Sequence, residues 1–375
     1  MKKLLFLHFL KDTLFFFLLM SLSLGLIVWV IQAVNYLDFI TEDGHGFYVY
    51  FSYTLFNFPK IIHRIAPFVF FISLFYQINK YELKNELIIF WASGVSKLQF
   101  IKVIFCFSLF FFIFQMIVGA YVSPKSQDKA RNFIRNSNID FFPSLFQEGK
   151  FIDVVQNLTI FIESENSRGE YSNVFLKEIQ TRNKNLSKVI YAKSGFLINK
   201  EKKRYLELYD GNIINIDRNK VNNFSFQRIE FDLTQYQSKS ISYPKFQELD
   251  SYLLVKCLNY HLQGRANELV SEFMSCSKDT IKNIKEELLK RFYKPIYLPL
   301  LSLLACLIFF ITKESKKFTF YKYLIFTIGI LTITISELSL RYASNSIIGL
   351  YFFIVFPLLA ILILYIFMNN KSKKN

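Results

Sequence analysis

Three basic side chains stand close together in the run FPKIIHRIAP, at Lys60, His63 and Arg64. Lysine attracts phosphate by its charge, and arginine can hold phosphate by two parallel hydrogen bonds, so this cluster suits a phosphorylated ligand. The alternative is that the side chains extend out of an apolar run toward the water at a membrane surface. The residue types alone leave both interpretations open for each of the three.

Glu337 and Arg341 are a second pair that can carry chemistry. They are four residues apart, which makes them neighbours on one face of a helix. Ionisable groups at membrane depth are functional candidates, whereas a paired couple at the membrane surface is a structural tether. Arg341 can equally face an internal cavity, and both interpretations stay open.

The sequence holds none of the motifs that mark common catalytic sites. A GxxxxGK[ST] run, which would cradle nucleotide phosphates, is absent, and so are GxSxG and HExxH. No pair of histidines has metal-ligand spacing. Glu163 and Glu165 are typical of solvated strand faces, and Asp210-Gly211 is typical of a hairpin turn. We therefore expect no catalytic residue, no metal and no cofactor.

Hydrophobic residues make up 52% of the 375 residues and are gathered in blocks. Six windows are candidate membrane spans, because a bilayer core needs roughly 20 apolar residues in a helix. They cover residues 13–34, 47–78, 100–122, 297–311, 318–336 and 347–368. The fourth is short, and we expect its helix to begin near Phe292. The first is too long for a signal peptide and lacks a cleavage site after it, so we interpret it as an uncleaved span.

The formal net charge of +16 is spread unevenly over the loops. Lys and Arg in short loops mark the cytoplasmic side of a membrane protein. They cluster before the first window, between the second and third windows, between the fourth and fifth windows, and after the last window. Residues 35–46, between the first and second windows, contain no Lys or Arg but do contain the acidic residues Asp38, Glu42 and Asp43. This alternation predicts that both termini are cytoplasmic. It also explains the basic excess without nucleic-acid binding.

A polar block lies between the third and fourth windows, at about 123–289. Its first two-thirds consist of short alternating runs rich in Val, Ile, Phe and Tyr, which predicts an all-β sandwich or a curled sheet. From about Phe246 apolar residues recur at helical spacing, and KDTIKNIKEELLKRF leads directly into the fourth span. Cys257 and Cys276 fall on the outer side, where a disulfide can form, although their spacing does not demand one.

The stretch NELIIFWASGVSKLQF, residues 85–100, is too polar for a span and too apolar for a loop. As a helix it brings its large apolar residues near one face, beside Glu86. These residues are Leu83, Leu87, Phe90 with Trp91, and Val95. Gly94 suits a left-handed helix end, and Ser96 with Gln99 makes a capping-box pattern for the next helix.

Two interpretations of this short helix remain. It can lie on the bilayer surface, or it can dock in a groove of another protein. In the second case Glu86 would seek a basic partner, while Phe90 and Trp91 would anchor in apolar pockets.

The run from Pro59 to Ser96 resembles the segment shared by the LptF/LptG permeases, the membrane subunits of the ABC transporter that extracts lipopolysaccharide from the inner membrane. The matching positions are Pro59, Pro67, Asn85-Glu86-Leu87 and Ala92-Ser93-Gly94. The resemblance extends over essentially the full length. Later runs, among them YAKSGFL and EFDLTQY, look more like LptF than LptG.

This resemblance implies a membrane protein with an α-helical bundle of six transmembrane helices and an inserted periplasmic all-β, β-jellyroll-like domain. Residues 1–122 would hold the first three spans, with a cytoplasmic coupling helix at about 81–95. Residues 123–290 would form the periplasmic domain with its connecting helices, and 291–375 the last three spans.

The resemblance further implies a permease subunit without enzymatic activity of its own. Glu86, Leu87, Phe90, Trp91 and Gly94 would seat the coupling helix in an LptB-like ATPase dimer. A paralogous LptG-like subunit would complete a cavity for lipopolysaccharide, and LptC/LptA-like periplasmic jellyroll proteins would receive the lipid.

For the lipid headgroup, the resemblance implicates Lys60, His63, Arg64 and Arg341. Lys60 is the strongest of these, because family members commonly carry a basic or polar residue just after the first Pro. The acidic first outer loop departs from what a phosphate-binding entrance would prefer.

Other classes fit less well. An FtsX- or MacB-like mechanotransmitter has four spans and an outer domain after the first. A membrane-anchored enzyme acting on lipids or cell-wall precursors would need a catalytic cluster at one bilayer face. A binding scaffold would leave Glu86 and the Pro59–Pro67 pair without a use.

Overall fold

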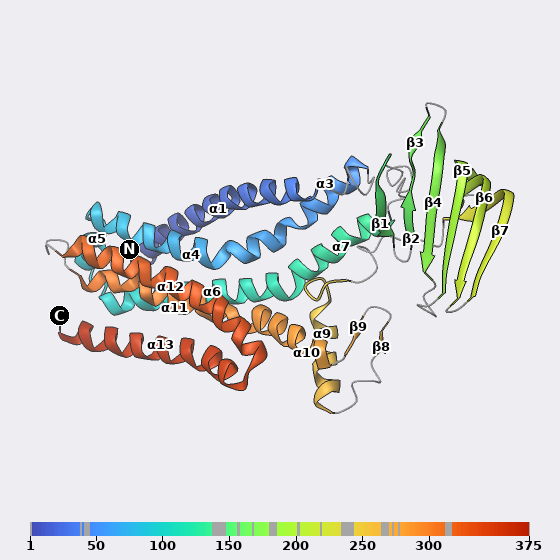
Figure 1. Cartoon of the computed structure of the whole chain (residues 1–375). Coiled ribbons are helices and arrows are strands. Elements are labelled where there is room, and N and C mark those ends of the chain that lie inside the picture. Colours follow the sequence, from blue (N-terminus) through green and yellow to red (C-terminus); the bar gives the residue numbers. More distant parts are fainter. Residues whose placement is uncertain are drawn as a thin grey trace. The chain divides into compact units, whose positions relative to one another are not determined.

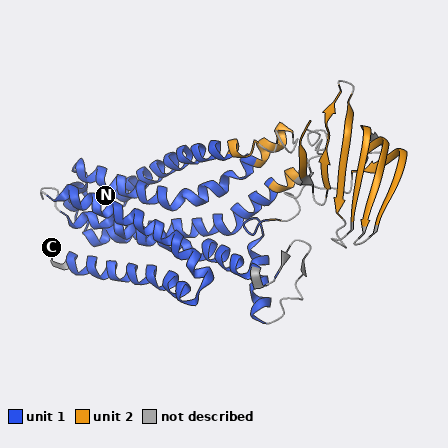
Figure 2. Ribbon diagram, viewed as in Figure 1, with its two compact units in different colours: residues 1–32, 54–130, 245–375 blue, residues 33–53, 131–244 orange. Residues whose placement is uncertain are grey.

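The computed structural model describes residues 2–37, 40, 46–136, 148–155, 158–166, 169–179, 186–200, 203–217, 220–233, 244–263, 270–271, 274–276, 278–311 and 317–374. Asp38, Glu42 and Asp43 of the acidic loop lie outside these residues. The chain divides into two compact units (Figure 2). The helical unit comprises residues 1–32, 54–130 and 245–375, and the sheet unit comprises 33–53 and 131–244.

Six helical stretches of the described residues are long and apolar enough to cross a membrane, as the hydropathy pattern predicted. They are Lys2–Asn35, Phe47–Leu83, Lys97–Ile134, Thr280–Phe310, Phe318–Asn345 and Ile347–Ser372. The single helices α1 (Lys2–Asn35), α12 (Phe318–Asn345) and α13 (Ile347–Lys374) provide the first, fifth and sixth. The fourth begins earlier than its apolar window, as expected for a helix that enters from the polar block.

The second, third and fourth stretches are each built from several elements (Figure 1). The second joins α3 (Phe47–Phe56) to α4 (Phe58–Leu83). The third joins α6 (Lys97–Ile117) to α7 (Ser123–Asn136) through the π-turn η1 (Val118–Val122). The fourth runs from α10 (Lys278–Leu288) through the π-turn η3 (Leu289–Tyr293) and the 3-10 turn η4 (Lys294–Ile296), which contains Pro295, to α11 (Tyr297–Cys306) and η5 (Leu307–Phe310).

Aromatic packing holds the helical unit together. Phe70, Phe71 and Phe100 are fully buried in one apolar cluster with residues of α11. A Cβ atom at Gly329 of α12 would lie 2.0 Å from the ring of Phe71, so a side chain at 329 would push the two helices apart. In contrast, α1 and α13 expose most of their apolar residues, which suits surfaces that face lipid.

One end of the helical unit gathers the start of α1, the short helix α5 (Leu87–Ala92) and the end of α13 (Figure 1). There the ammonium of Lys2 donates a hydrogen bond to the carbonyl of Gly94 over 2.9 Å. The ammonium groups of Lys97 and Lys371 lie 5.7 and 5.8 Å from the centre of the Phe310 ring, within cation–π range. Lys97, at the end of the link between the second and third spans, therefore lies near Lys371 of the C-terminal helix.

The sheet unit contains a seven-stranded antiparallel sheet in the order β1-β2-β4-β5-β6-β7, with β3 paired to β4. The strands are β1 (Phe151–Val155), β2 (Leu158–Phe161), β3 (Ser164–Glu165), β4 (Glu170–Ile179), β5 (Leu186–Lys200), β6 (Lys203–Asp217) and β7 (Lys220–Asp232). Its buried side chains form one cluster that includes Leu158, Val174 and Leu206. The prediction of an inserted all-β domain is confirmed.

Asp210-Gly211 is not a hairpin turn, because β6 runs straight through it. Asp210 adopts a φ of 47°, and so does Asn173 on β4. Their positions align across the sheet, since Ser172 pairs with Ser194 and Ser194 with Tyr209. At this line the alternation of buried residues slips by one position, from Leu206 and Leu208 to Ile213 on β6. The left-handed residue Asp210 thus lets the strand continue, while the alternation of buried and exposed side chains is shifted by one residue beyond it.

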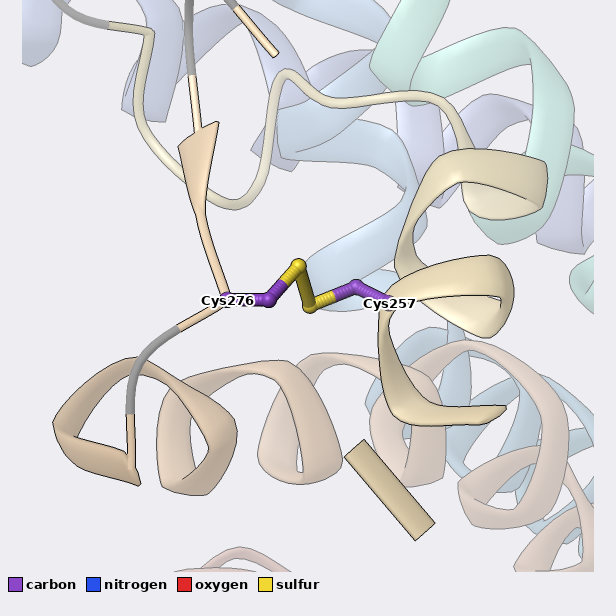
Figure 3. Close-up of a disulfide and its surroundings, with 2 residues drawn as sticks. All are labelled: Cys257 and Cys276. Atoms are coloured by element: carbon purple, nitrogen blue, oxygen red, sulfur yellow. A yellow bond between two sulfur atoms is a disulfide. The ribbon is translucent and has the colours of Figure 1, made fainter. Parts of the chain in front are cut away.

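The chain between the sheet and α10 contains α9 (Ser251–Leu262) and two short strands, β8 (Val270–Ser271) and β9 (Met274–Ser275). A disulfide joins Cys257 of α9 to Cys276, with 5.9 Å between their Cα atoms (Figure 3). Both cysteines are buried in a small apolar cluster with Leu254, Ile284 and Leu288. The sequence left this pairing open, and the structure forms it.

Candidate functional site

The stretch between α4 and α6 consists of a stop, a short helix and a new start. Asn85 and Gly94 adopt φ values of 60° and 75°, which break the helix before and after α5. Ser96 caps α6 by accepting from the amide of Gln99, while the Gln99 side chain accepts from the amide of Ser96, both over 3.2 Å. The capping box and the left-handed glycine are confirmed. The short helix begins at Leu87, later than the predicted region from about 81.

Leu87 and Phe90 of α5 pack into the bundle rather than facing out. Leu87 and Phe90 are 1% and 2% exposed. The Phe90 ring lies 4.9 Å from that of Phe100 and 5.5 Å from that of Phe6. Trp91 is half-buried and contacts Phe309, with 6.2 Å between ring centres. The expectation that Phe90 and Trp91 anchor in a partner's pockets is therefore wrong for Phe90, which the bundle itself encloses.

The outward surface of α5 consists instead of Ile88 and Ile89, which are 58% and 53% exposed. Glu86 stands beside them, with its carboxylate 4.0 Å from the ammonium of Lys84. The amide of Glu86 donates to the carbonyl of Tyr81 over 2.9 Å, which ties the acidic residue to the end of α4. Leu83 does not share this helix, since it ends α4.

A polar contact fastens α1 to α4 close to this helix. Asp12 accepts hydrogen bonds from the hydroxyl of Tyr81 at 3.0 Å and from the amide of Gln77 at 3.3 Å. Together with the bond from Lys2 to Gly94, it fastens the first helix to α4 and to the glycine that follows α5.

A cavity of about 240 Å³ lies among α4, α6, the fourth span and α12. Its lining residues are His63, Arg64, Pro67, Gln115, Gln247, Glu286, Lys290, Lys294, Pro295, Glu337, Leu340 and Arg341. Four of them carry a positive charge and two carry a carboxylate. Such an excess suits an anion with several charged oxygens.

The structure brings together most of the predicted headgroup residues. His63 and Arg64 of α4 and Arg341 of α12 all line the cavity. Lys60 is one helical turn before Arg64 and is not among the lining residues. Sequence reasoning missed Lys290 and Lys294, which lie where the polar block leads into the fourth span. Their spacing of four residues just ahead of the fourth apolar window was the available signal.

Two of the cavity's charges are paired across helices. The ammonium of Lys294 forms an ion pair with the carboxylate of Glu337, joining the fourth span to α12. Glu337 and Arg341, the pair considered from sequence, do not form an ion pair in the described part of the chain. The guanidinium of Arg341 is thus left to the cavity.

A glycine in the π-turn η1 makes room for His63. A Cβ atom at Gly119 would lie 2.5 Å from Cε1 of the His63 ring. Gln115, one turn before, donates its side-chain amide to the carbonyl of His63 over 2.6 Å. The third span therefore sets the position of His63 in the cavity wall. Among the described residues, no group of three or more His, Cys, Asp or Glu could hold a metal ion.

Comparisons with known proteins agree with this architecture. A family model described as "Lipopolysaccharide export system permease LptF/LptG" matches residues 7–371, nearly the whole chain. The chain is also similar to the uncharacterized protein RP871 of Rickettsia prowazekii (strain Madrid E). The two are 25% identical over 339 residues, which cover 87% of each chain.

Proposed function

Because the chain belongs to the LptF/LptG family of lipopolysaccharide export permeases, we propose that its cationic cavity holds the phosphorylated headgroup of lipopolysaccharide during ATP-driven export. Family and spans make it a multi-pass protein of the inner membrane and a component of a transporter. The single observation that carries the proposal is the cavity itself, where cations of three spans converge.

The chemistry of the cavity supports this ligand. Arg64 and Arg341 can each bind phosphate oxygens by paired hydrogen bonds, and Lys290 adds a further charge. Charged residues are costly at membrane depth unless they pair or meet a charged ligand. Lys294 is already paired with Glu337, and the ammonium of Lys290 lies 3.5 Å from the carboxylate of Glu287 on its own helix. Among the described residues this leaves Arg64 and Arg341 as the cavity cations that are available to the lipid, with Lys290 adding a charge that it shares with Glu287. His63 contributes a ring to the wall, and Lys60 would meet the headgroup only outside the cavity.

The helix α5 is proposed as the contact with a separate ATPase, an LptB-like dimer. Its exposed Ile88 and Ile89 offer an apolar surface, and Glu86 beside them offers a charge for a basic partner. Leu87, Phe90 and Trp91 would not contact the ATPase directly. They would attach α5 to the spans, because they pack into the apolar cluster of the bundle. Gly94 ends the helix so that α6 can start afresh.

Two features at opposite ends of the helical unit support the proposed orientation. Lysines gather near α5 and the end of α13, as expected for the cytoplasmic side. The disulfide between Cys257 and Cys276 lies between α9 and α10, and disulfides persist in oxidising compartments such as the periplasm. Both termini would then be cytoplasmic and the sheet unit periplasmic.

The remaining proposed partners complete the transport route. A paralogous permease would close the lipid cavity from the other side, and this chain would be the LptF-like member of the pair. The strands β1 and β7 end the order of the described sheet, and an edge strand can pair with a strand of LptC/LptA-like jellyroll proteins.

The experiment that tests the proposal combines co-purification with lipid capture. The full chain, carrying a photo-crosslinking amino acid at position 340 in the cavity wall, is expressed in a bacterium that makes lipopolysaccharide. We expect it to purify with an ATPase and a second six-span subunit, and to crosslink to lipopolysaccharide. Purification without either protein, or a lack of lipid capture at 340, would contradict the proposal.

A further inference from the structure

Arg291 is almost completely enclosed, yet all five of its N–H groups have an acceptor. It lies in the π-turn η3 and is 1% exposed. Its Nε donates to the carboxylate of Glu287 over 3.0 Å. Its two terminal nitrogens donate to one segment of backbone and a hydroxyl: the carbonyls of Phe246 (3.2 Å), Gln247 (3.0 Å) and Leu249 (3.0 Å), and Oγ of Ser251 (2.8 Å). The guanidinium has five such donors and no more.

The same segment is also attached to the third span. The hydroxyl of Ser251 donates to the carbonyl of Ala120, in the π-turn η1, over 2.5 Å. The side chain of Gln127 donates to the carbonyl of Gln247 over 3.3 Å. The two π-turns η1 and η3 contact one another. π-turns are rare, interrupt the regular hydrogen bonds of a helix and are frequent at functional sites. Residues 246–251 are thus clamped between two such interruptions.

The residues that this clamp holds are also residues of the cavity wall. Gln247 lines the cavity from the clamped segment. Glu286, Lys290 and Lys294 line it from the helix that carries Arg291 and its partner Glu287. Lys290 and Lys294 are four residues apart and share a face, whereas Arg291 turns away toward the segment. One buried side chain therefore connects two separate parts of the wall.

We propose that Arg291 is a positioning residue for this cavity: it fixes η3 and residues 246–251 in register, so that Lys290 and Gln247 present their polar groups to the bound phosphate. The inference rests on the proposed headgroup function. Arg291 itself contacts no ligand, since its N–H groups are all directed to the protein.

Lysine cannot replace arginine in this role. An ammonium is a point charge with three donors, whereas the planar fork of Arg291 reaches four acceptors on one segment and Glu287 besides. Arg291→Lys would keep the charge near Glu287 but would deprive the carbonyls of Phe246 and Leu249 of their guanidinium donors and leave the carbonyl of Gln247 with Gln127 alone, which is costly. The segment is then expected to shift until water or another donor reaches those carbonyls.

The disulfide offers a matched control on the same segment. Replacing both Cys257 and Cys276 by Ser removes the disulfide that joins α9 to the residues before α10. The hydrogen bonds of Arg291 are not changed by this replacement. Both variants weaken the attachment of residues 246–276, and only one of them removes the clamp at the cavity. A role in folding alone predicts similar effects from both.

Two readouts are measured on the full complex. The first is lipopolysaccharide capture by a photo-crosslinker at 340, normalised to the yield of the complex and compared with its Tm. The second is the rate at which a maleimide labels Lys290→Cys, in a background with Cys106→Ser. For Arg291→Lys we expect capture to fall on the order of tenfold. Labelling at 290 should rise by about threefold or more as the wall loosens. The double serine variant should lower Tm without either change.

Unchanged capture and labelling in Arg291→Lys would overturn the inference. So would equal losses of capture in Arg291→Lys and the double serine variant, when Tm falls equally. If Arg291→Lys does not assemble, Ser251→Ala removes one of its acceptors and is subjected to the same measurements. Lack of capture in the parent protein, with labelling at 290 still dependent on Arg291, would refute the headgroup site but not the clamp.

Discussion

Lys294 pairs with Glu337 at the wall of the cavity, so the acid of α12 is bound by the fourth span rather than by Arg341 four residues away. Lys294 is 12% exposed, whereas the carboxylate of Glu337 is half exposed. Lys290 in turn lies 3.5 Å from the carboxylate of Glu287, so that among the described residues Arg64 and Arg341 are the cavity cations that remain for a ligand.

Replacing Glu337 by Gln should destabilise the protein without weakening lipid binding. Removing one partner of a buried ion pair leaves an uncompensated charge, and partial exposure of Glu337 reduces the cost to about 1–3 kcal/mol. Thermal unfolding of the purified complex measures the change. Glu286→Gln is the charge-matched control, since Glu286 lines the same cavity but makes no ion pair in the described part of the chain. Equal Tm losses in both variants would contradict the structural role of the pair.

Substitutions on α5 should separate docking from packing. Ile88→Glu and Ile89→Glu are expected to abolish co-purification of the ATPase while the subunit keeps its Tm, because both side chains are exposed. Phe90→Ala should instead lower stability by about 3–5 kcal/mol, as for other buried aromatic residues. If both isoleucine variants retain the ATPase, α5 lies on the bilayer surface and another segment makes the contact.

Glu86→Lys should reduce binding of the ATPase or uncouple ATP hydrolysis from lipid release. The substitution reverses the charge that we propose meets a basic partner, and like charges at an interface are repulsive. Glu86→Gln should have a weaker effect. Co-purification and ATPase activity in the presence of lipopolysaccharide measure both. A Glu86→Lys complex that binds and transports like the parent would show that the partner does not contact this carboxylate.

Removing a cation that lines the cavity should lower lipopolysaccharide capture more than removing a nearby cation that does not line it. Arg64→Gln and Arg341→Gln are each expected to lower lipopolysaccharide capture on the order of tenfold, the cost of about one charge-assisted hydrogen bond. Lys60→Gln removes the same charge one turn away and should change capture less than either. The crosslinker is placed at Leu340 for this series. A larger loss with Lys60→Gln than with Arg64→Gln would move the headgroup site toward the end of α4 that precedes the cavity.

The disulfide provides a test of orientation. In intact cells a membrane-impermeant reductant, followed by an impermeant maleimide, should label Cys257 and Cys276 after the outer membrane is permeabilised. Without the reductant both cysteines should remain unlabelled, because they are bonded to each other. Labelling that also requires disruption of the inner membrane would reverse the proposed topology.

The pattern of apolar residues was sufficient for the architecture. Long apolar windows predict spans because the bilayer thickness sets their length, and alternation predicts strands because side chains repeat every two residues. Local signals were equally reliable at Gly94 and at Ser96 with Gln99, where the cap depends on neighbouring residues alone.

What failed depended on contacts between distant residues. Helical spacing puts Phe90 on an apolar stripe, but whether that stripe faces a partner or the bundle depends on Phe6 and Phe100. Lys290 and Lys294 join Arg64 only after some 220 intervening residues have folded back. Sequence spacing does not carry that information, and the same holds for the pairing of Cys257 with Cys276.

The aligned positions Asn173 and Asp210 limit which insertions and deletions the sheet can accept during evolution. Each strand that crosses this line switches the side on which its apolar residues lie. A one-residue deletion on one side of the line in β6 alone would invert half of that strand relative to its neighbours. Strands β4, β5 and β6 can therefore be lengthened or shortened at their ends, but around this line they are expected to be inherited as a single unit.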